Sequence, residues 1–380
     1  MHDADREAIT RLSRQAFGVD PTDFRWREGG RVLTVGGRVM AGVCVQRFDQ
    51  VFGGRAVPSG GLAWVTVAPE VRGRGYGMTL AGTLMREIKD AGAVISTVHP
   101  VSFHMWRRLG YEASAARSTY EAATADIRIA GEDVLGLRRR ELDELDGVVE
   151  CYRLVAASHA GLVDRSGTWW REVVLRSEEP LSLYVAMEGE RVSAYVLYSQ
   201  APVGGDFEYQ RIRCRELIWS SRRGGASLMG FLAAHHPMIR TVSWPGPLDD
   251  PLVRFFDQGA VRVPSRILCM TRLLDVPNAL TARGYPPGSD EEVALGVVDP
   301  MLPENNGAWR LRVADGIADI GPASAPAPRV DVGTLAAMYT GWLHPWDAAR
   351  LGGLEGFSPH QLAALARLFS GPKPWLPEAV

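Results

Sequence analysis

The sequence lacks several features that would place a protein in a class at once. Its 380 residues hold no unbroken apolar run of membrane-spanning length, and the charged N-terminus lacks the apolar core of a signal peptide. The 4 cysteines lie far apart with no CxxC pair, so we expect reduced core residues and no metal site. The formal net charge of −2 gives no electrostatic argument for binding nucleic acid or an anionic membrane. We therefore expect a cytoplasmic protein whose partners are small molecules.

Two common phosphate-binding motifs are also missing. There is no Gly-Lys-Ser/Thr of a P-loop, and no G-x-G-x-x-G followed by the acidic residue of a dinucleotide site. The composition, 46% hydrophobic and 23% charged, is that of a globular protein with ample material for packed cores. The length predicts two or three domains.

The most informative stretch is the sequence Val-Ala-Pro-Glu-Val-Arg-Gly-Arg-Gly-Tyr-Gly at residues 67–77. It follows the apolar run 62–67, and apolar residues at helical spacing follow it as far as Ile88. This pattern predicts a strand, a glycine-rich turn and a helix that starts at the turn. Backbone amides and the positive end of the helix would then face one point, which favours an anion, and Arg72 and Arg74 add charge.

The order of the other expected elements indicates an α/β fold with repeated units. Around the motif we expect a helix at 5–17, a hairpin at 32–48, a strand at 94–98 and a short helix at 103–109. A weaker repeat follows, with helices at 141–157 and 168–176, a hairpin at 183–197, a strand at 215–219 and a helix at 228–234. Beyond residue 271 we expect helices at 274–285, 333–340 and 359–369, and strands at 309–313 and 318–320.

Taken together, the chain resembles the Eis ("enhanced intracellular survival") family of GNAT acyltransferases. The resemblance rests on four pieces in the same order: residues 61–69, the Arg72-x-x-Gly75-x-Gly77 loop, Leu109-Gly110-Tyr111, and the segment 275–285. It implies a GNAT domain at residues 1–125 and a degenerate second GNAT domain at 126–270. It also implies a sterol-carrier-protein-like α+β domain at 271–380, whose tail reaches the active site. The second domain lacks the full loop, so we do not expect it to bind CoA.

The resemblance also implies a cofactor and a reaction. Family members transfer acetyl from acetyl-CoA to amines, including amines of aminoglycosides, and often assemble as hexamers. The backbone at Val65 and Val67 would pair with the pantetheine arm of acetyl-CoA. The loop residues that would hold its pyrophosphate are Arg72, Gly73, Arg74, Gly75 and Gly77.

Two proton-handling groups are carried over from the family. The terminal carboxylate, here that of Val380, would act as base for the amine. The family's acid is a tyrosine five residues before the tyrosine of Leu-Gly-Tyr, but this chain has Trp106 there. An indole N–H donates a hydrogen bond without giving up its proton, so Trp106 could stabilise the departing thiolate weakly but could not protonate it. His99, at the end of an expected strand, can take that role.

The substrate is not readable from the sequence. Trp26 and Trp64 suit stacking on a ring, while Asp23, Glu28 and Glu378 could attract an amine. Because Trp106 replaces the acid, two alternatives stay open beside acetyl transfer to an aminoglycoside-like or secondary-metabolite amine. One is a repurposed pocket with CoA-independent chemistry in secondary metabolism. The other is a non-catalytic protein that binds a ligand and confers resistance.

Overall fold

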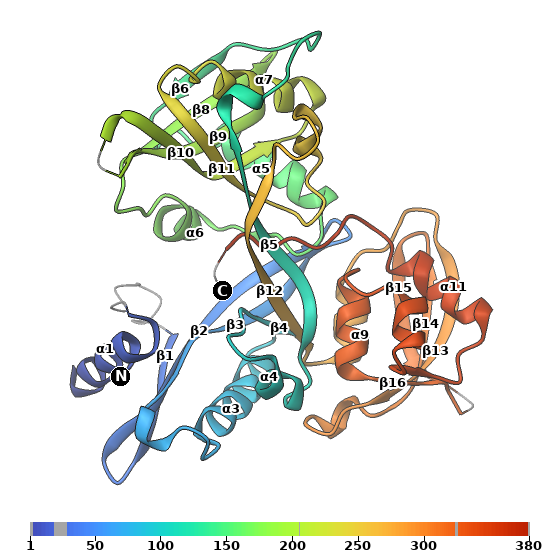
Figure 1. Ribbon diagram of the computed structural model, residues 1–380. Coiled ribbons are helices and arrows are strands. Elements are labelled where there is room, and N and C mark those ends of the chain that lie inside the picture. The colour runs from blue at the N-terminus through green and yellow to red at the C-terminus, as the bar shows by residue number, and fades with distance from the viewer. Residues whose placement is uncertain (1–2, 19–28, 205, 324–325, 379–380) are drawn as a thin grey trace. The chain divides into compact units, whose positions relative to one another are not determined.

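The computed structural model describes residues 3–18, 29–204, 206–323 and 326–378 (Figure 1). The described chain forms two compact units. The first holds the residues up to Ala115, Leu268–Pro374 and Glu378, and the second holds Ala116–Ile267 and Trp375–Pro377. Strands β5 (Glu112–Ala123) and β12 (Arg262–Leu273) each have residues in both units.

The N-terminal half of the first unit is a mixed sheet with strand order β1-β2-β3-β4-β12. Its strands and helices are α1 (Asp3–Phe17), β1 (Gly30–Val35), β2 (Arg38–Phe52), β3 (Arg55–Val67), α3 (Tyr76–Asp90), β4 (Ile95–Val98) and α4 (Phe103–Arg108). Successive residues of β2 pack in different cores: Val43 lies with Leu84 of α3, and Cys44 lies with Ile9 of α1. Since side chains alternate along a strand, α1 and α3 cover opposite faces of this sheet.

The C-terminal half of the first unit has its own five-stranded sheet, in the order β15-β14-β13-β16-β17. Its elements are α8 (Val276–Ala282), β13 (Asp290–Val298), β14 (Gly307–Ala314), β15 (Ile317–Pro322), β16 (Arg329–Asp331), α9 (Val332–Tyr339), α10 (Pro345–Arg350), β17 (Leu354–Glu355) and α11 (Pro359–Leu368). Helix α8 begins where the side chain of Asp275 accepts a hydrogen bond from the amide of Asn278 at 3.0 Å.

The two halves of the first unit meet backbone to backbone at two glycines. Gly53 lies in the turn between β2 and β3, and Gly284 follows α8. The amide of Gly284 donates to the carbonyl of Phe52 at 3.0 Å. A Cβ atom on either glycine would collide with the carbonyl oxygen of the other. Both positions therefore require glycine, because the two backbone segments approach each other closely.

The second unit repeats the sheet-and-helix plan of the first sheet, with strand order β5-β11-β10-β9-β8-β6. Its elements are β6 (Leu137–Arg140), α5 (Asp146–Ser158), β7 (Val163–Asp164), α6 (Gly167–Trp169), a π-helical turn (Trp170–Val174), β8 (Leu181–Glu188), β9 (Arg191–Val203), β10 (Asp206–Trp219), α7 (Arg222–Ala233) and β11 (Ile239–Gly246).

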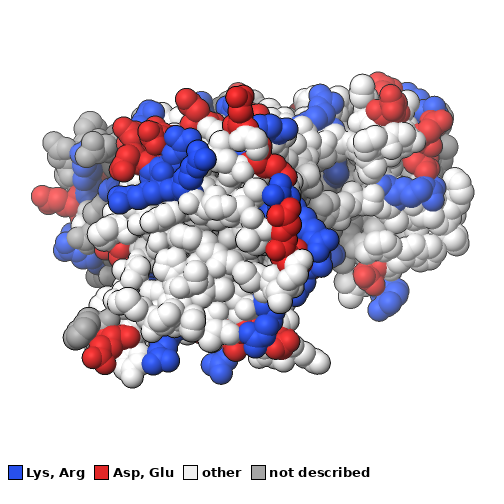
Figure 2. All heavy atoms as spheres, turned by 90° about the horizontal axis from the view of Figure 1, so that it is seen from above, with Lys and Arg blue, Asp and Glu red and all other residues white. Residues whose placement is uncertain are grey.

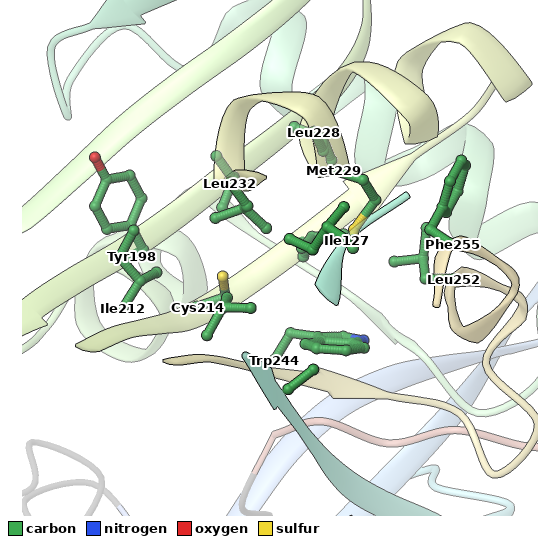
Figure 3. Close-up of a cluster of buried hydrophobic side chains, with 14 of the residues drawn as sticks. Ile127, Tyr198, Ile212, Cys214, Leu228, Met229, Leu232, Trp244, Leu252 and Phe255 are labelled. Atoms are coloured by element: carbon green, nitrogen blue, oxygen red, sulfur yellow. The ribbon is translucent and has the colours of Figure 1, made fainter. Parts of the chain in front are cut away.

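The core of the second unit lies between α7 and the sheet (Figure 3). Leu228 and Leu232 of α7 pack with Ile212 of β10 and Trp244 of β11. Leu252, in the 3₁₀ turn Pro251–Phe255, belongs to the same cluster. Burial of these side chains provides the main driving force for this half of the fold.

Charged side chains of both signs are interspersed over the face drawn in Figure 2, without separation into a basic and an acidic field. Exposed pairs such as Arg310 with Asp319, at 3.2 Å, follow this pattern. In the described part of the chain, no helix combines the length and the hydropathy needed to cross a membrane.

The α/β fold expected from the sequence is confirmed, as are the helices at 5–17, 103–109, 333–340 and 359–369. Helix α7 begins at Arg222, six residues before the expected start at 228. In place of the single helix expected at 168–176, the chain forms one α-turn followed by a π-helical turn. No strand was expected at β5, β6, β7, β11, β12, β13, β16 or β17. The domain limits expected at residues 125 and 270 stay predictions, since the two compact units describe a different division of the chain.

Candidate active site

The glycine-rich loop joins β3 to α3 as the sequence predicts. Gly73 and Gly75 have φ angles of 79° and 86°, a left-handed conformation that favours glycine. Gly75 is the residue before the first turn of α3, and neither a side-chain cap nor an acidic residue is found there. The first amides of a helix have no partner inside it, so this N-terminus is suited to hold an anion.

The loop is packed closely against the end of β3. Gly77 is buried, and a Cβ on it would lie 3.1 Å from Cγ2 of Val67 and 3.7 Å from Sδ of Met105. Arg72 is exposed, and its Nε donates to the carbonyl of Val67 at 3.3 Å. Arg74 is exposed as well. The structure therefore brings all the predicted loop residues together at the start of α3.

Strand β3 leaves its parallel neighbour before it reaches the loop. The pairs between β3 and β4 run only from Ser59–Ile95 to Gly61–Thr97. On its other edge β3 stays paired with β2 as far as Val67. The half-buried residues Val65 and Val67 thus lie where one edge of β3 has no partner strand in the described chain. An extended ligand with amide groups can pair with such an edge.

Trp64 forms a β-bulge in this part of β3. Ala63 pairs with Cys44 and Thr66 pairs with Gly42, so Trp64 and Val65 together face one residue of β2. Trp64 has a φ angle of 56°, which is rare for any residue but glycine and costs on the order of 1–3 kcal/mol. Its ring contacts that of Phe17 edge to face, with centroids 5.3 Å apart. The sequence analysis identified Trp64 as a candidate but not this backbone strain.

His99 follows directly after β4, at the level where β3 and β4 separate. Its Nε2 atom lies 3.1 Å from Sγ of Cys269, a fully buried residue of β12. Cysteine and histidine can share a proton across such a contact. The sequence analysis predicted His99 but treated Cys269 only as a core residue, because nothing in the sequence pairs the two strands.

A line of buried hydroxyl groups runs along the same face of β4 and β12. Thr97, two residues before His99, donates to Oε1 of Gln50 at 2.6 Å and lies 3.4 Å from the hydroxyl of Thr271. The hydroxyl of Ser114 lies 2.7 Å from that of Thr271 and 3.3 Å from the carbonyl of Cys269. Residues two apart on a strand share a face, so this network holds the backbone of the His99–Cys269 pair.

Trp106 lies on α4 and is a core residue, with 4% of its surface exposed. Its ring packs edge to face on Tyr111, with centroids 5.0 Å apart. The hydroxyl of Tyr111 bonds Ser96 at 2.8 Å, and burial raises the pKa of Tyr111 to about 12 although Ser96 and the charge of Arg272 lower it. Tyr111 is therefore held inside the core.

A buried ion pair between Arg272 and Asp299 packs against the Leu-Gly-Tyr turn. The Nη2 atom of Arg272 lies 2.5 Å from Asp299, and both side chains are fully buried. A Cβ on Gly110, whose φ is 80°, would clash with the Arg272 guanidinium. Asn305 and the amides of Met301 and Leu302 also bond Asp299. Gly110 is thus required both for its φ angle and for the space that Arg272 occupies.

The remaining candidates concern the ends of the chain. Glu378 is buried, with 7% of its surface exposed. Trp26 and Val380, and the carboxylates of Asp23 and Glu28, lie outside the described residues. No group of three or more potential metal ligands occurs among the residues that the structure describes.

Comparisons with known protein families match three successive segments. Residues 1–114 and 161–273 each match an acetyltransferase (GNAT) domain family, and residues 276–377 match a sterol carrier protein domain family.

Curated relatives align with most of the chain. An uncharacterized N-acetyltransferase of Streptomyces avermitilis is 26% identical over 342 residues, covering 86% of this chain and 82% of the relative. The N-acetyltransferase Eis of Mycobacterium tuberculosis is 26% identical over 309 residues, covering 75% and 71%.

Solved structures share the whole fold. A GCN5-related N-acetyltransferase of Anabaena variabilis has a TM-score of 0.92 at 26% identity, covering 100% of this chain and 98% of its own. Eis1 of Mycobacterium abscessus has a TM-score of 0.80 at 23% identity, covering 99% and 98%. With two GNAT domains followed by a sterol carrier protein domain, this chain belongs to the Eis-like GNAT N-acetyltransferases.

Proposed function

We propose that this protein transfers an acetyl group from acetyl-CoA directly to a small amine. The observation that carries the proposal is the junction of β3 and α3. There an uncapped helix N-terminus follows a strand edge that has lost its parallel partner. One structure thus offers amides for a phosphate and, next to them, a strand edge for an amide-bearing arm.

The residues of this junction fit the cofactor. Acetyl-CoA supplies the activated acyl group. The amides of Gly73, Gly75 and Gly77 would hold its pyrophosphate, with Arg72 and Arg74 adding charge. The backbone of Val65 and Val67 would pair with the pantetheine arm. The close packing at Gly77 supports this assignment, because any larger residue there would push the helix start away from β3.

Two groups would move the protons. The carboxylate at Val380 would remove a proton from the attacking amine, as the resemblance to the family implies. His99 would return a proton to the departing thiolate, since the indole of Trp106 cannot. The contact between His99 and Cys269 supports this role, because it fixes the imidazole at the end of β4.

The substrate would be an amine that presents a ring to tryptophan. Trp64 and Trp26 would form the wall, and Glu378 would contribute negative charge. Aminoglycoside-like and other secondary-metabolite amines have these properties. A cytoplasmic location and assembly into a homo-oligomer, a hexamer by resemblance, are part of the same proposal.

Calorimetric titration with acetyl-CoA tests the cofactor. We expect saturable binding with one site per chain and at least a tenfold loss of affinity in Gly75→Glu and in Arg72→Ala. Gly92→Glu is a matched control, because Gly92 has a φ of 98°, open space around it and lies at the other end of α3. Strain alone would affect both glycine variants equally.

Release of free thiol in the presence of candidate amines then tests the reaction. If acetyl-CoA does not bind at all, the proposal fails, and the buried Trp106 points to CoA-independent chemistry in a repurposed pocket. If it binds but no amine releases thiol, the protein is a binding protein.

A further inference from the structure

The second unit contains a cavity that the proposed function does not use. It has a volume of about 780 Å³, which is within the range of small-molecule sites. Every residue that lines it belongs to the second unit. It lies at the C-terminal end of β10, the strand that corresponds in this unit to β3 in the first.

The cavity has a strand edge as one wall. Strand β10 pairs in parallel with β11 only from Gln210 to Arg213, whereas on its other edge it stays paired with β9 as far as Trp219. Leu217, Ile218 and Trp219 line the cavity beyond the point where β11 departs. Backbone groups on such an edge favour a ligand that carries amides of its own.

The opposite wall cannot close this gap by pairing with β10. It contains Pro245, Pro247 and Pro251, and proline has no backbone N–H to donate. Leu154 and Val155 of α5 and Leu252 add apolar surface. The lining thus combines an extended edge with apolar side chains on two walls, while Glu188, Arg191 and Asp250 contribute charged or titratable groups.

The helix that follows β10 is less suited to a phosphate than α3 is. Ser221 caps α7 by accepting a hydrogen bond from the amide of Gly224 at 3.0 Å, whereas Gly75 provides no cap for α3. The two arginines at the start of α7 are engaged in ion pairs: Arg222 with Glu132, and Arg223 with Asp133 and Glu188. The start of α7 and its two arginines are therefore already engaged within the chain, and among the cationic side chains Arg191 is the one that lines the cavity.

We propose that this cavity binds an extended, uncharged, apolar molecule with amide groups, namely a short apolar peptide or N-acylated peptide. Its amides pair with the free edge of β10, and its side chains pack between α5 and the proline wall. The site is independent of acetyl-CoA, and the proposal goes beyond the acetyl transfer proposed above.

Calorimetric titration of the full chain with N-acetyl-leucyl-leucine amide tests the proposal. We expect saturable binding, and about tenfold weaker binding of the same peptide with both leucine nitrogens methylated. Methylation keeps the apolar groups but removes the N–H donors that would bond to the strand edge.

Two variants locate the site. Ser158→Trp places a large ring on an exposed residue that lines the cavity, and we expect it to abolish binding. Arg153→Trp adds the same ring to an exposed position of α5 outside the lining, and we expect unchanged affinity. Circular dichroism melting curves confirm that both variants fold. No saturable binding at millimolar peptide, equal binding of the methylated peptide, or full binding by Ser158→Trp would each overturn the proposal.

Discussion

The Nε2 atom of His99 and the Sγ atom of Cys269 lie 3.1 Å apart, at the point where β4 ends beside β12. The pair is held by the hydroxyl line of Thr97, Thr271 and Ser114. Neither residue is near the other in sequence, so the sheet alone creates the contact.

If His99 handles the proton of the departing thiolate, its replacement must slow the chemical step. We expect His99→Gln to lower kcat for amine-dependent thiol release by about 10²-fold or more. Cys269→Ala should lower kcat by about 3–10-fold, because the imidazole loses one fixed partner, and Cys269→Ser should restore most of it. The KM for acetyl-CoA should not change. Full activity of His99→Gln would remove His99 from the mechanism.

By resemblance to the family, Trp106 stands where a tyrosine would act as general acid, and the variant Trp106→Tyr restores that side chain. We expect Trp106→Tyr to raise kcat by up to about tenfold, since a phenol can donate a proton where an indole cannot. Trp106→Phe is the matched control, with similar bulk in the same core and no hydroxyl group. Equal kcat values for the two variants would mean that the thiolate needs no acid at this position.

The ion pair of Arg272 and Asp299 should dominate the stability of the Leu-Gly-Tyr turn. Asp299→Asn leaves a buried arginine without its counter-charge, and we expect a loss of about 3–5 kcal/mol in the free energy of unfolding. Arg312→Gln, which breaks an exposed pair with Asp290 at 2.8 Å, should cost less than about 1 kcal/mol. Urea unfolding measures both. Similar losses in the two variants would contradict the prediction.

Asp250 should make stability depend on pH in an unusual direction. Burial raises its pKa from 3.8 to about 6, although hydrogen bonds from Leu252 and Trp244 act against the rise. The folded chain therefore binds an extra proton between about pH 4 and pH 6, and this residue's contribution to stability falls as pH rises through that window.

Between about pH 4 and pH 6, Asp250 should lower the free energy of unfolding by about 2–3 kcal/mol in total. Urea unfolding of the wild type and Asp250→Asn across this range measures it as the difference between their pH profiles. Asp249→Asn, at an exposed neighbour, removes only the smallest cause of the raised pKa of Asp250, so it should retain most of the wild-type fall in stability. Parallel profiles for the wild type and Asp250→Asn would show that the carboxyl titrates normally.

The sequence predicted best where local chemistry determines structure. The glycine-rich turn and the apolar spacing of α3 each depend on a few neighbouring residues, so the loop and its helix were predicted almost to the residue. Strand β5 was missed because most of its buried residues are serine and alanine, which give no apolar alternation in the sequence. Strands β11 and β13 bury apolar residues at about every second position, a strand pattern that went unrecognised.

The site shows the same division. Loop residues adjacent in sequence were found, whereas the partner of His99, the strain at Trp64 and the ion pair behind Gly110 depend on distant strands. The packing of the Trp106 ring on Tyr111 in the core likewise depends on how the helix and the following strand fold together.

The contact between Gly53 and Gly284 has a consequence for how the protein can be divided. Family comparisons match the segments on either side of residue 275 to separate domains, which suggests modules that could be expressed singly. Yet the hairpin that begins β3 is bonded through Phe52 to the chain just after α8, with no space for a single methyl group. A truncation before residue 276 would remove the segment that packs against this hairpin, so we expect β3 and the C-terminal half of the first unit to unfold together.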